Sequence, residues 1–173
     1  GELAAAEDTG TITTAANMTI TSTASTNTAG VGGLVGDLSS GGTWASTLSF
    51  NNLTVSGQSG VGGAIGSVEG TLSGALTKTG GNVTGSGSDI GGLFGYVDET
   101  ATVSANQTVN GTFSVFGNAT GSDIGGVAGD FRADSSSDFS ATDVTVDGNS
   151  GDAVGGVFGR FAATSQLDGS TIS

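Results

Sequence analysis

The sequence predicts an all-β fold, a parallel β-solenoid (β-helix) of about five coils with about 30 residues in each coil. The first reason is a six-residue glycine motif, in which Val or Ile precedes two glycines, two apolar residues and a final glycine. It starts at Val31, Val61, Ile90, Ile124 and Val154, so successive copies lie 30, 29, 34 and 30 residues apart. A nearly constant period of this length is typical of proteins built from stacked repeats. The second reason is the short apolar–polar alternation between the copies, which is typical of β-strands.

The first repeat, residues 31–60, shows the plan of one coil. The glycine motif leads into a turn of Ser and Gly at 39–42, after which residues 44–50 alternate as a second strand. A third short strand follows at 53–55. Alternating apolar and polar residues suit a half-buried pleated surface. We therefore expect three short strands in each coil, stacked about 4.8 Å above those of the preceding coil.

The later repeats keep this plan with local changes. The third repeat, residues 90–123, carries extra residues around 106–118, which predicts that one loop bulges out of the solenoid. The fourth repeat contains a polar insert at 134–138. The extra residues of the third repeat are expected to lie outside the regular coil, because an insertion is tolerated best in a surface connection.

The N-terminal region is expected to fall into two parts. Residues 1–10 differ in composition from the repeats and are interpreted as an N-terminal arm or extension. Strands predicted over 11–13 and 17–21 resemble the second half of a repeat, so the chain would enter the solenoid partway round a coil. The solenoid domain is therefore expected to span residues 11–173.

Alignment of the five copies gives each motif position a role. Position one is always Val or Ile, and position eight, two residues beyond the motif, is always apolar, so both are expected in the core. Positions two, three and six are always glycine. Glycine pairs suit either a positive φ or a backbone pressed so close to a neighbour that no Cβ fits. Alternation along a strand places positions four, six and eight inward and position seven outward.

Position five is apolar in every copy, although the same alternation turns it outward. Its residues are Val35, Ile65, Phe94, Ala128 and Phe158. Stacked coils would align these side chains into an apolar ridge, and exposed apolar patches of that kind mark interaction surfaces. The alternative is that the glycine pair bends the strand and turns position five into the core.

The repeated Gly-Gly-Leu-Val-Gly type of element resembles the GLUG-type repeats of bacterial and archaeal surface proteins and large β-solenoid adhesins. The resemblance covers residues 31–161 and depends on a short, glycine-based motif. It implies an extracellular solenoid that serves in adhesion or surface structure, and it supplies no catalytic residues.

The composition excludes several classes of function. The formal charge of −13 argues against binding to nucleic acids or to anionic membrane surfaces, both of which attract basic residues. No run approaches the about 20 apolar residues of a membrane span, so we expect no membrane insertion. Strong acidity favours solubility, cation binding, or a salty or extracellular medium. We expect a secreted, extracellular or cell-surface location.

The chain contains little catalytic chemistry. It has no His and no Cys, which excludes the usual Ser–His and Cys–His nucleophiles. We therefore expect neither an enzyme nor a cofactor, and a pair of carboxylates acting on polysaccharide is the one catalytic alternative left open.

Acidic residues recur just before the glycine motif, at Asp89, Asp123 and Asp152. Stacking would bring them together, and Ca²⁺ takes oxygen ligands, so they are candidates for a calcium site. The alternative is that they are solvated turn residues. Asp130 and Arg160 share a motif column one coil apart, which predicts a surface ion pair that contributes at most about 1 kcal/mol.

Six Asn-x-Thr sequons would be glycan acceptors in a secreted protein. They are Asn17, Asn52, Asn82, Asn106, Asn110 and Asn118. Strand positions such as Asn17 are expected to be less accessible than Asn106, Asn110 and Asn118.

These features favour a structural subunit of an extracellular filament or cell-surface assembly. It would associate with further copies of itself through the solenoid ends and the apolar ridge. The first alternative is an adhesin or glycan-binding module of a larger surface protein, with cell-surface glycans as partners. A third hypothesis is ice binding by flat Thr arrays, although Thr-x-Thr does not recur in every coil of the sequence.

Overall fold

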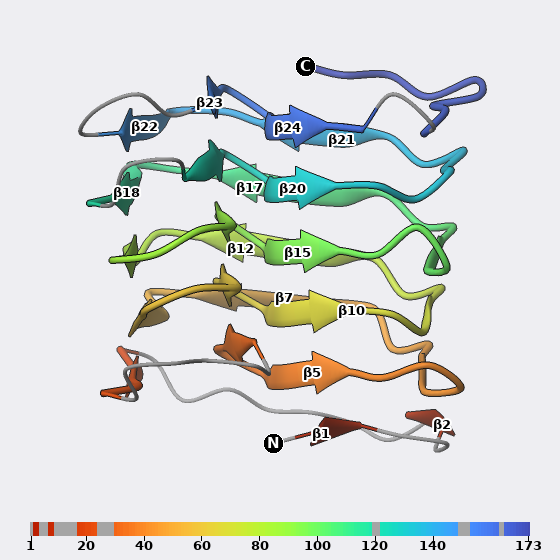
Figure 1. Cartoon of the computed structure of the whole chain (residues 1–173), viewed down its shortest axis with the longest axis horizontal. Helices are drawn as coiled ribbons and strands as arrows, with labels where there is room; N and C mark the ends of the chain where they lie inside the picture. The colour runs from red at the N-terminus through yellow and green to blue at the C-terminus, as the bar shows by residue number, and fades with distance from the viewer. Residues whose placement is uncertain are drawn as a thin grey trace.

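The computed structural model shows the predicted parallel β-solenoid, in which short strands stack in successive coils (Figure 1). The structure describes residues 2–3, 7–8, 17–23, 30–118, 122–148, 153–162 and 165–173. Four turns separate Val31 from Val154, because the start of each motif pairs in register with the start of the next. The five copies of the motif therefore occupy equivalent places in successive coils. Within these ranges, no helix is long and apolar enough to cross a membrane.

The strands form five parallel sheets that run along the solenoid, which we name the entry, front, short, back and side sheets. The entry sheet contains the first residues of each motif, in β4 (Val31–Gly32), β9 (Val61–Gly62), β14 (Ile90–Gly91), β19 (Asp123–Gly125) and β23 (Ala153–Gly155). The front sheet contains β1 (Glu2–Leu3), β5 (Val35–Leu38), β10 (Ile65–Val68), β15 (Phe94–Val97), β20 (Ala128–Phe131) and β24 (Phe158–Phe161). The short sheet contains β2 (Glu7–Asp8), β6 (Thr43–Trp44), β11 (Thr71–Leu72) and β16 (Thr102–Val103).

The remaining two sheets complete each coil. The back sheet contains β7 (Leu48–Asn51), β12 (Leu76–Thr79), β17 (Gln107–Asn110) and β21 (Phe139–Ala141). The side sheet contains β3 (Thr19–Thr21), β8 (Thr54–Gly57), β13 (Val83–Gly85), β18 (Phe113–Gly117) and β22 (Val144–Gly148). A complete coil such as β9 to β13 thus has five short strands, so the prediction of three strands per coil is wrong. The glycine motif supplies two of them, separated by a bend, where the sequence suggested one.

The two predicted irregularities are absorbed into the coils. Residues 107–110 and 113–117 in the third repeat are strands in register with their neighbours, so the bulging loop predicted around 106–118 is wrong. In the fourth repeat, Ser135 forms parallel bridges with Val103 and Leu167 and continues the short sheet. A polar insert can occupy this column because the Ser135 hydroxyl donates to the carbonyl oxygen of Val103 at 2.8 Å.

The described N-terminal residues belong to the solenoid. Glu2 and Leu3 pair with Asp37 and Leu38 of the front sheet, and β2 pairs with β6 in the short sheet. The described part of the predicted N-terminal arm or extension thus adds one strand to the edge of each of these two sheets. The strand predicted at 17–21 is confirmed over Thr19–Thr21, and the one predicted at 11–13 lies outside the described residues.

Position five of the motif points into the core, so the predicted outward ridge is wrong. Ile65, Phe94 and Ala128 have no exposed surface, and Val35 and Phe158 are half-buried against the same core at the two ends. The bend at positions three and four interrupts the alternation, which starts again at position five with the front strand. Position eight also faces inward and is buried in the first four copies, although it lies three residues beyond position five. The alternation is therefore broken a second time, at position six, which the pairing register of the front sheet skips.

The motif glycines are required by close backbone contacts rather than by backbone conformation. None of the described ones has a positive φ. A Cβ on Gly92, at position three, would lie 2.0 Å from the carbonyl oxygen of Gly126 in the next coil. A Cβ on Gly95, at position six, would lie 2.3 Å from the carbonyl carbon of Gly60 in the preceding coil. Of the two explanations that the sequence left open, close approach is correct.

A second column, at the corner between the back and side sheets, does depend on positive φ. Asn17, Asn52, Gly80, Gly111 and Asp143 occupy this corner in successive coils, with φ between 53° and 80°. Gly, Asn and Asp are the residues that tolerate this conformation best. The chain thus changes sheet at the same point of every coil.

Lys78 is the one basic residue buried in the described core. Its Nζ donates hydrogen bonds to the carbonyl oxygens of Gly80 and Gly81, and it lies 4.3 Å from the centre of the Phe113 ring. Burial lowers the pKa of this amine from 10.5 to about 8. The carbonyl groups and the ring offset part of the cost of burying the charge.

The third motif position offers a matched test of the stacking contacts. Gly92→Ala is expected to lower the free energy of unfolding by about 3 kcal/mol or more, because the new methyl group must displace backbone. Gly156→Ala is expected to change it by less than about 0.5 kcal/mol, because nothing lies within 4 Å of the added Cβ. Urea midpoints of the two variants measure the difference. Equal effects would show that the coils are not packed as described.

The low pKa of Lys78 makes stability depend on alkaline pH. The folded protein loses this proton near pH 8 and the unfolded chain near pH 10.5, so between these values the unfolded chain holds more protons. Stability is therefore expected to rise from pH 8 to pH 10, by about 2 kcal/mol in urea unfolding. Lys78→Met should remove this rise. A rise of the same size in Lys78→Met would show that another titrating side chain causes the increase in the free energy of unfolding.

Candidate functional site

The C-terminal end of the solenoid exposes the side chains that elsewhere form its core. Val154 is 48%, Phe161 39% and Ile172 50% exposed, and every other large hydrophobic residue in the described ranges is less exposed than these three. We call these three residues, with the outer edges of β23 and β24, the end face. Figure 1 shows β23 and β24 in the uppermost coil, near the C-terminus.

Register explains this exposure. Val154 pairs with Ile124, and Phe161 pairs with Phe131, both of which are fully buried. The end face therefore presents core positions that have no described coil above them. The rings of Phe131 and Phe161 are stacked, with centroids 6.0 Å apart, so Phe161 is held in place by the coil below. Beside it, Gly156 faces open space.

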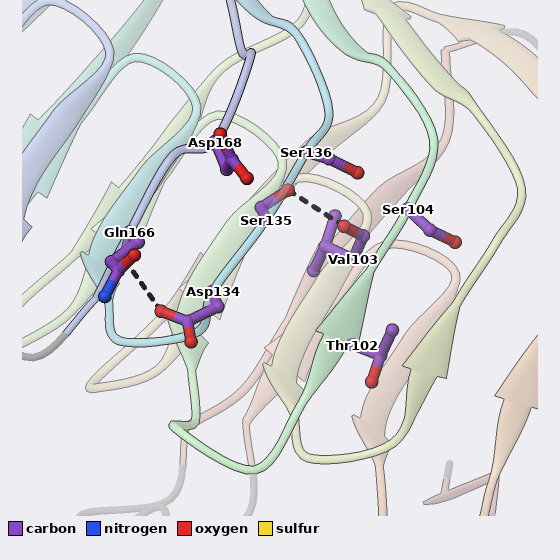
Figure 2. A pocket seen from close by; sticks show the side chains of 8 residues that line it. All are labelled: Thr102, Val103, Ser104, Asp134, Ser135, Ser136, Gln166 and Asp168. Atoms are coloured by element: carbon purple, nitrogen blue, oxygen red, sulfur yellow. Dashed lines mark hydrogen bonds between the residues drawn. The ribbon is translucent and has the colours of Figure 1, made fainter.

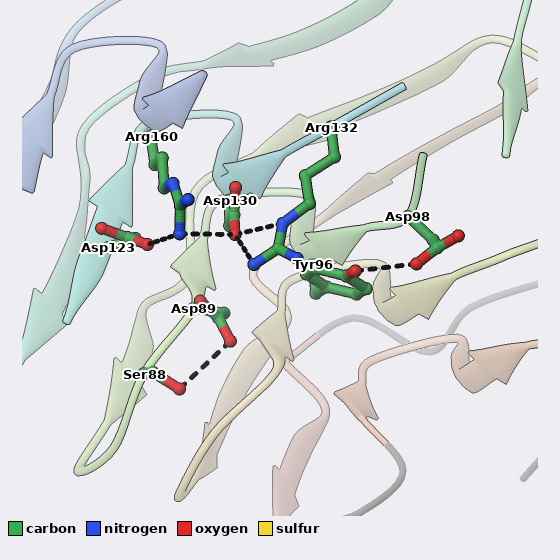
Figure 3. Close-up of polar contacts among 8 residues, drawn as sticks. All are labelled: Ser88, Asp89, Tyr96, Asp98, Asp123, Asp130, Arg132 and Arg160. Carbon is green, nitrogen blue, oxygen red and sulfur yellow. Dashed lines mark hydrogen bonds and ion pairs between the residues drawn. The ribbon is translucent and has the colours of Figure 1, made fainter. Parts of the chain in front are cut away.

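A ladder of charged residues lies on the front sheet just below the end face (Figure 3). Tyr96, Asp130 and Arg160 occupy motif position seven in three successive coils. Asp130 has no exposed side-chain surface, and its Oδ2 lies 2.6 Å from Nη2 of Arg132 and 3.7 Å from Nη1 of Arg160. The predicted ion pair between Asp130 and Arg160 is therefore present, and Arg132, which sequence reasoning missed, is the closer partner.

The calcium candidates are brought together only in part. Carboxylate oxygens of Asp89, Asp123 and Asp130 all lie within 4.8 Å of one another, whereas Asp152 lies outside the described residues. Nη1 of Arg160 lies 4.0 Å from Asp123 as well as near Asp130, so guanidinium groups already lie among the carboxylates. Burial raises the pKa of Asp89, and repulsion from the other two carboxylates adds to this shift. The arrangement is an ion-pair network that links three coils.

Tyr96 and Arg132 extend this network along the sheet. The guanidinium carbon of Arg132 lies 4.9 Å from the centre of the Tyr96 ring, and the Tyr96 hydroxyl donates to Oδ2 of Asp98 at 2.7 Å. Burial, together with this hydrogen bond, raises the pKa of Tyr96 to about 12. The side chains therefore hold one another in fixed positions.

A polar pocket of about 330 Å³ lies beside the short sheet, between the third and fifth coils (Figure 2). Its lining residues are Thr102, Val103, Ser104, Asp134, Ser135, Ser136, Gln166 and Asp168. Oδ1 of Asp134 accepts a hydrogen bond from the backbone of Gln166 at 2.7 Å. Hydroxyl, carboxylate and amide groups can bind the hydroxyl groups of a small polar ligand, but the lining offers no aromatic ring on which a sugar could stack.

The sequons differ in how freely they present their amides. Asn17, Asn52, Asn82, Asn106 and Asn118 are exposed, and Asn110 is half-buried. The Asn106 side chain exchanges hydrogen bonds with Asp138 in the next coil, and Oδ1 of Asn110 accepts one from Thr79. Two of the three sequons expected to be most accessible are thus held in contacts between coils, and Asn17 is more exposed than expected.

The fold and these surfaces define the chain as a parallel β-solenoid with an exposed apolar end, a charged ladder and a polar pocket. Comparisons with protein-family models, with curated protein sequences and with solved structures gave no match.

Proposed function

We propose that the protein is a structural subunit of an extracellular filament or cell-surface assembly, and that copies associate through the ends of the solenoid. The observation that carries this proposal is the end face, where Val154, Phe161 and Ile172 expose core positions. Burying a fully exposed side chain of this kind contributes about 1.5–3 kcal/mol, and because these three are only 39–50% exposed, covering the rest of each contributes about half of that. Covering all three therefore favours a contact with another protein surface.

The strand edges favour head-to-tail contacts. All described strands of the front sheet are parallel, and β1 and β24 form its two edges. A parallel sheet has two different edges, so a second copy can add at one end in the same strand direction. Contacts between unlike surfaces generate open filaments when the rotation between subunits does not close a ring.

Position five no longer contributes to this assembly, because its side chains belong to the core. These side chains offer no lateral apolar surface for self-association, and the end face is the apolar surface that remains for it. The resemblance of the glycine motif to GLUG-type repeats supports a surface location. Strong acidity, the lack of Cys and the exposed sequons are compatible with such a location.

Charge introduced into the end face is expected to prevent assembly. Phe161→Asp should raise the protein concentration needed for fibres at least about tenfold, because a buried carboxylate opposes the apolar contact. Ser86→Asp adds the same charge at an exposed turn and should have no effect. Negative-stain electron microscopy over a concentration series measures both variants. A parent protein that stays a monodisperse monomer at high concentration would contradict the proposal.

The polar pocket favours a second candidate function, an adhesin or glycan-binding module of a larger surface protein. A glycan array is expected to show binding that Asp168→Asn lowers at least about tenfold, since a carboxylate hydrogen bond to a sugar contributes about 1.5–3 kcal/mol. Ser86→Asp is again the control. An array with no bound glycan would exclude this candidate for the sugars tested.

A further inference from the structure

The outer surface of the back sheet carries two continuous columns of uncharged polar side chains. We call this surface the hydroxyl face. The first column contains Ser49, Thr77, Thr108 and Ser140, paired in register, with Ser173 hydrogen-bonded to Ser140 at 3.1 Å. The second contains Asn51, Thr79 and Asn110. Figure 1 shows the strands that carry these columns, β7, β12, β17 and β21, stacked behind the front sheet.

The hydroxyl face is neutral although the molecule is strongly acidic. Lys78 is the one charged residue in these four strands, and it is fully buried. The nearest carboxylates in sequence, Asp138 and Asp143, flank β21 at the rim of the face. The columns themselves therefore contribute nothing to the formal charge of −13.

This charge distribution favours contact between two copies through their uncharged surfaces. Copies with a formal charge of −13 repel one another, and the repulsion extends about 10 Å at 0.1 M salt. Repulsion is weakest where both facing surfaces lack charge. The side sheet also has outward columns of uncharged polar residues, but it carries Asp147 in β22, so of these two sheets the hydroxyl face brings fewer carboxylates together.

We propose that the hydroxyl face binds the hydroxyl face of a second copy, related by a two-fold axis. Both columns repeat at the spacing of the coils, about 4.8 Å, and the second copy has the same spacing. Ladders with equal repeats match along their whole height, as in the paired sheets of polar zippers. Ser and Thr hydroxyls both donate and accept, so either direction of a hydrogen bond can form across the contact.

The size of the face sets the strength of this contact. Five levels and one four-residue strand cover about 20 Å by about 13 Å, or about 300 Å² on each partner. A stable complex buries about 800 Å² on each partner. Isolated copies therefore pair weakly, whereas filaments gain one such contact with every subunit and join side by side. This last step, lateral bundling, depends on the proposed function.

Single cysteines test the pairing without filaments, because the chain contains no Cys. Thr108 lies in the third of five levels, so a two-fold axis near the centre of the face brings it close to its counterpart. Thr108→Cys is expected to form covalent dimers with a short bis-maleimide at least about tenfold faster than Thr84→Cys, at about 1 mM protein. Thr84 is the matched control, because it is a half-buried Thr that points out of the neighbouring side sheet.

Equal dimer formation by the two variants, both folded by circular dichroism, would overturn the pairing. Inhibition of ice recrystallisation that Thr108→Glu abolishes would also overturn it and assign the face to ice. The two proposals fail separately. Fast cross-linking of Thr108→Cys in a protein that forms no fibres would contradict the filament proposal and support the pairing of hydroxyl faces. Single, unbundled fibres together with slow cross-linking would contradict the pairing and support the filament proposal.

Discussion

The contact between glycine backbones of successive coils is the constraint on which the rest of the structure depends. At motif positions two, three and six of the inner coils, an added Cβ would collide with backbone atoms of the same or a neighbouring coil. These contacts draw the entry and front sheets together at the bend. The bend turns position five inward, as with Phe94, and so produces a core with apolar residues at positions one, four, five and eight. A single substitution with Ala in an inner coil therefore affects the sheets on both sides of the bend.

The same constraint explains why the last coil differs from the inner coils. Gly156 occupies the column in which Gly92 and Gly126 are crowded, yet nothing lies within 4 Å of its added Cβ. The residues around Gly156 are of the same apolar types as those at the core positions of the inner coils. Val154 and Phe161 are therefore apolar, although they are exposed. The end face therefore follows from the repetition. Each copy of the motif has residues that suit contact with a coil on both sides, whereas the fifth copy has a described coil on one side only.

The repeated features could be predicted from the sequence, and the features that depend on contacts between coils could not. Period and motif predicted the solenoid and all five repeat boundaries, because the register follows the sequence repeat. The number of strands per coil and the direction of position five were missed, since alternation cannot be counted across a bend. The corner at Asn52, Gly80 and Gly111 could have been predicted, because successive repeats have a Gly or Asn at this place. Arg132 could not be predicted as the main partner of Asp130, because the two residues are neighbours on one strand end rather than members of one column.

The placement of the three basic residues connects the fold with assembly. Lys78 is buried, and Arg132 and Arg160 both contact Asp130. The two arginines thus compensate carboxylates within a coil and between coils, whereas the contacts of Lys78 are with carbonyl oxygens and a ring. The 16 acidic residues therefore far outnumber the basic residues that can neutralise them. Such a surface resists association wherever carboxylates would meet, and salt weakens this resistance. The strands of the hydroxyl face carry no carboxylate, and neither do β23 and β24 at the end face. The proposed association along the solenoid and the proposed pairing across it therefore depend on different chemistry and are expected to respond differently to substitution.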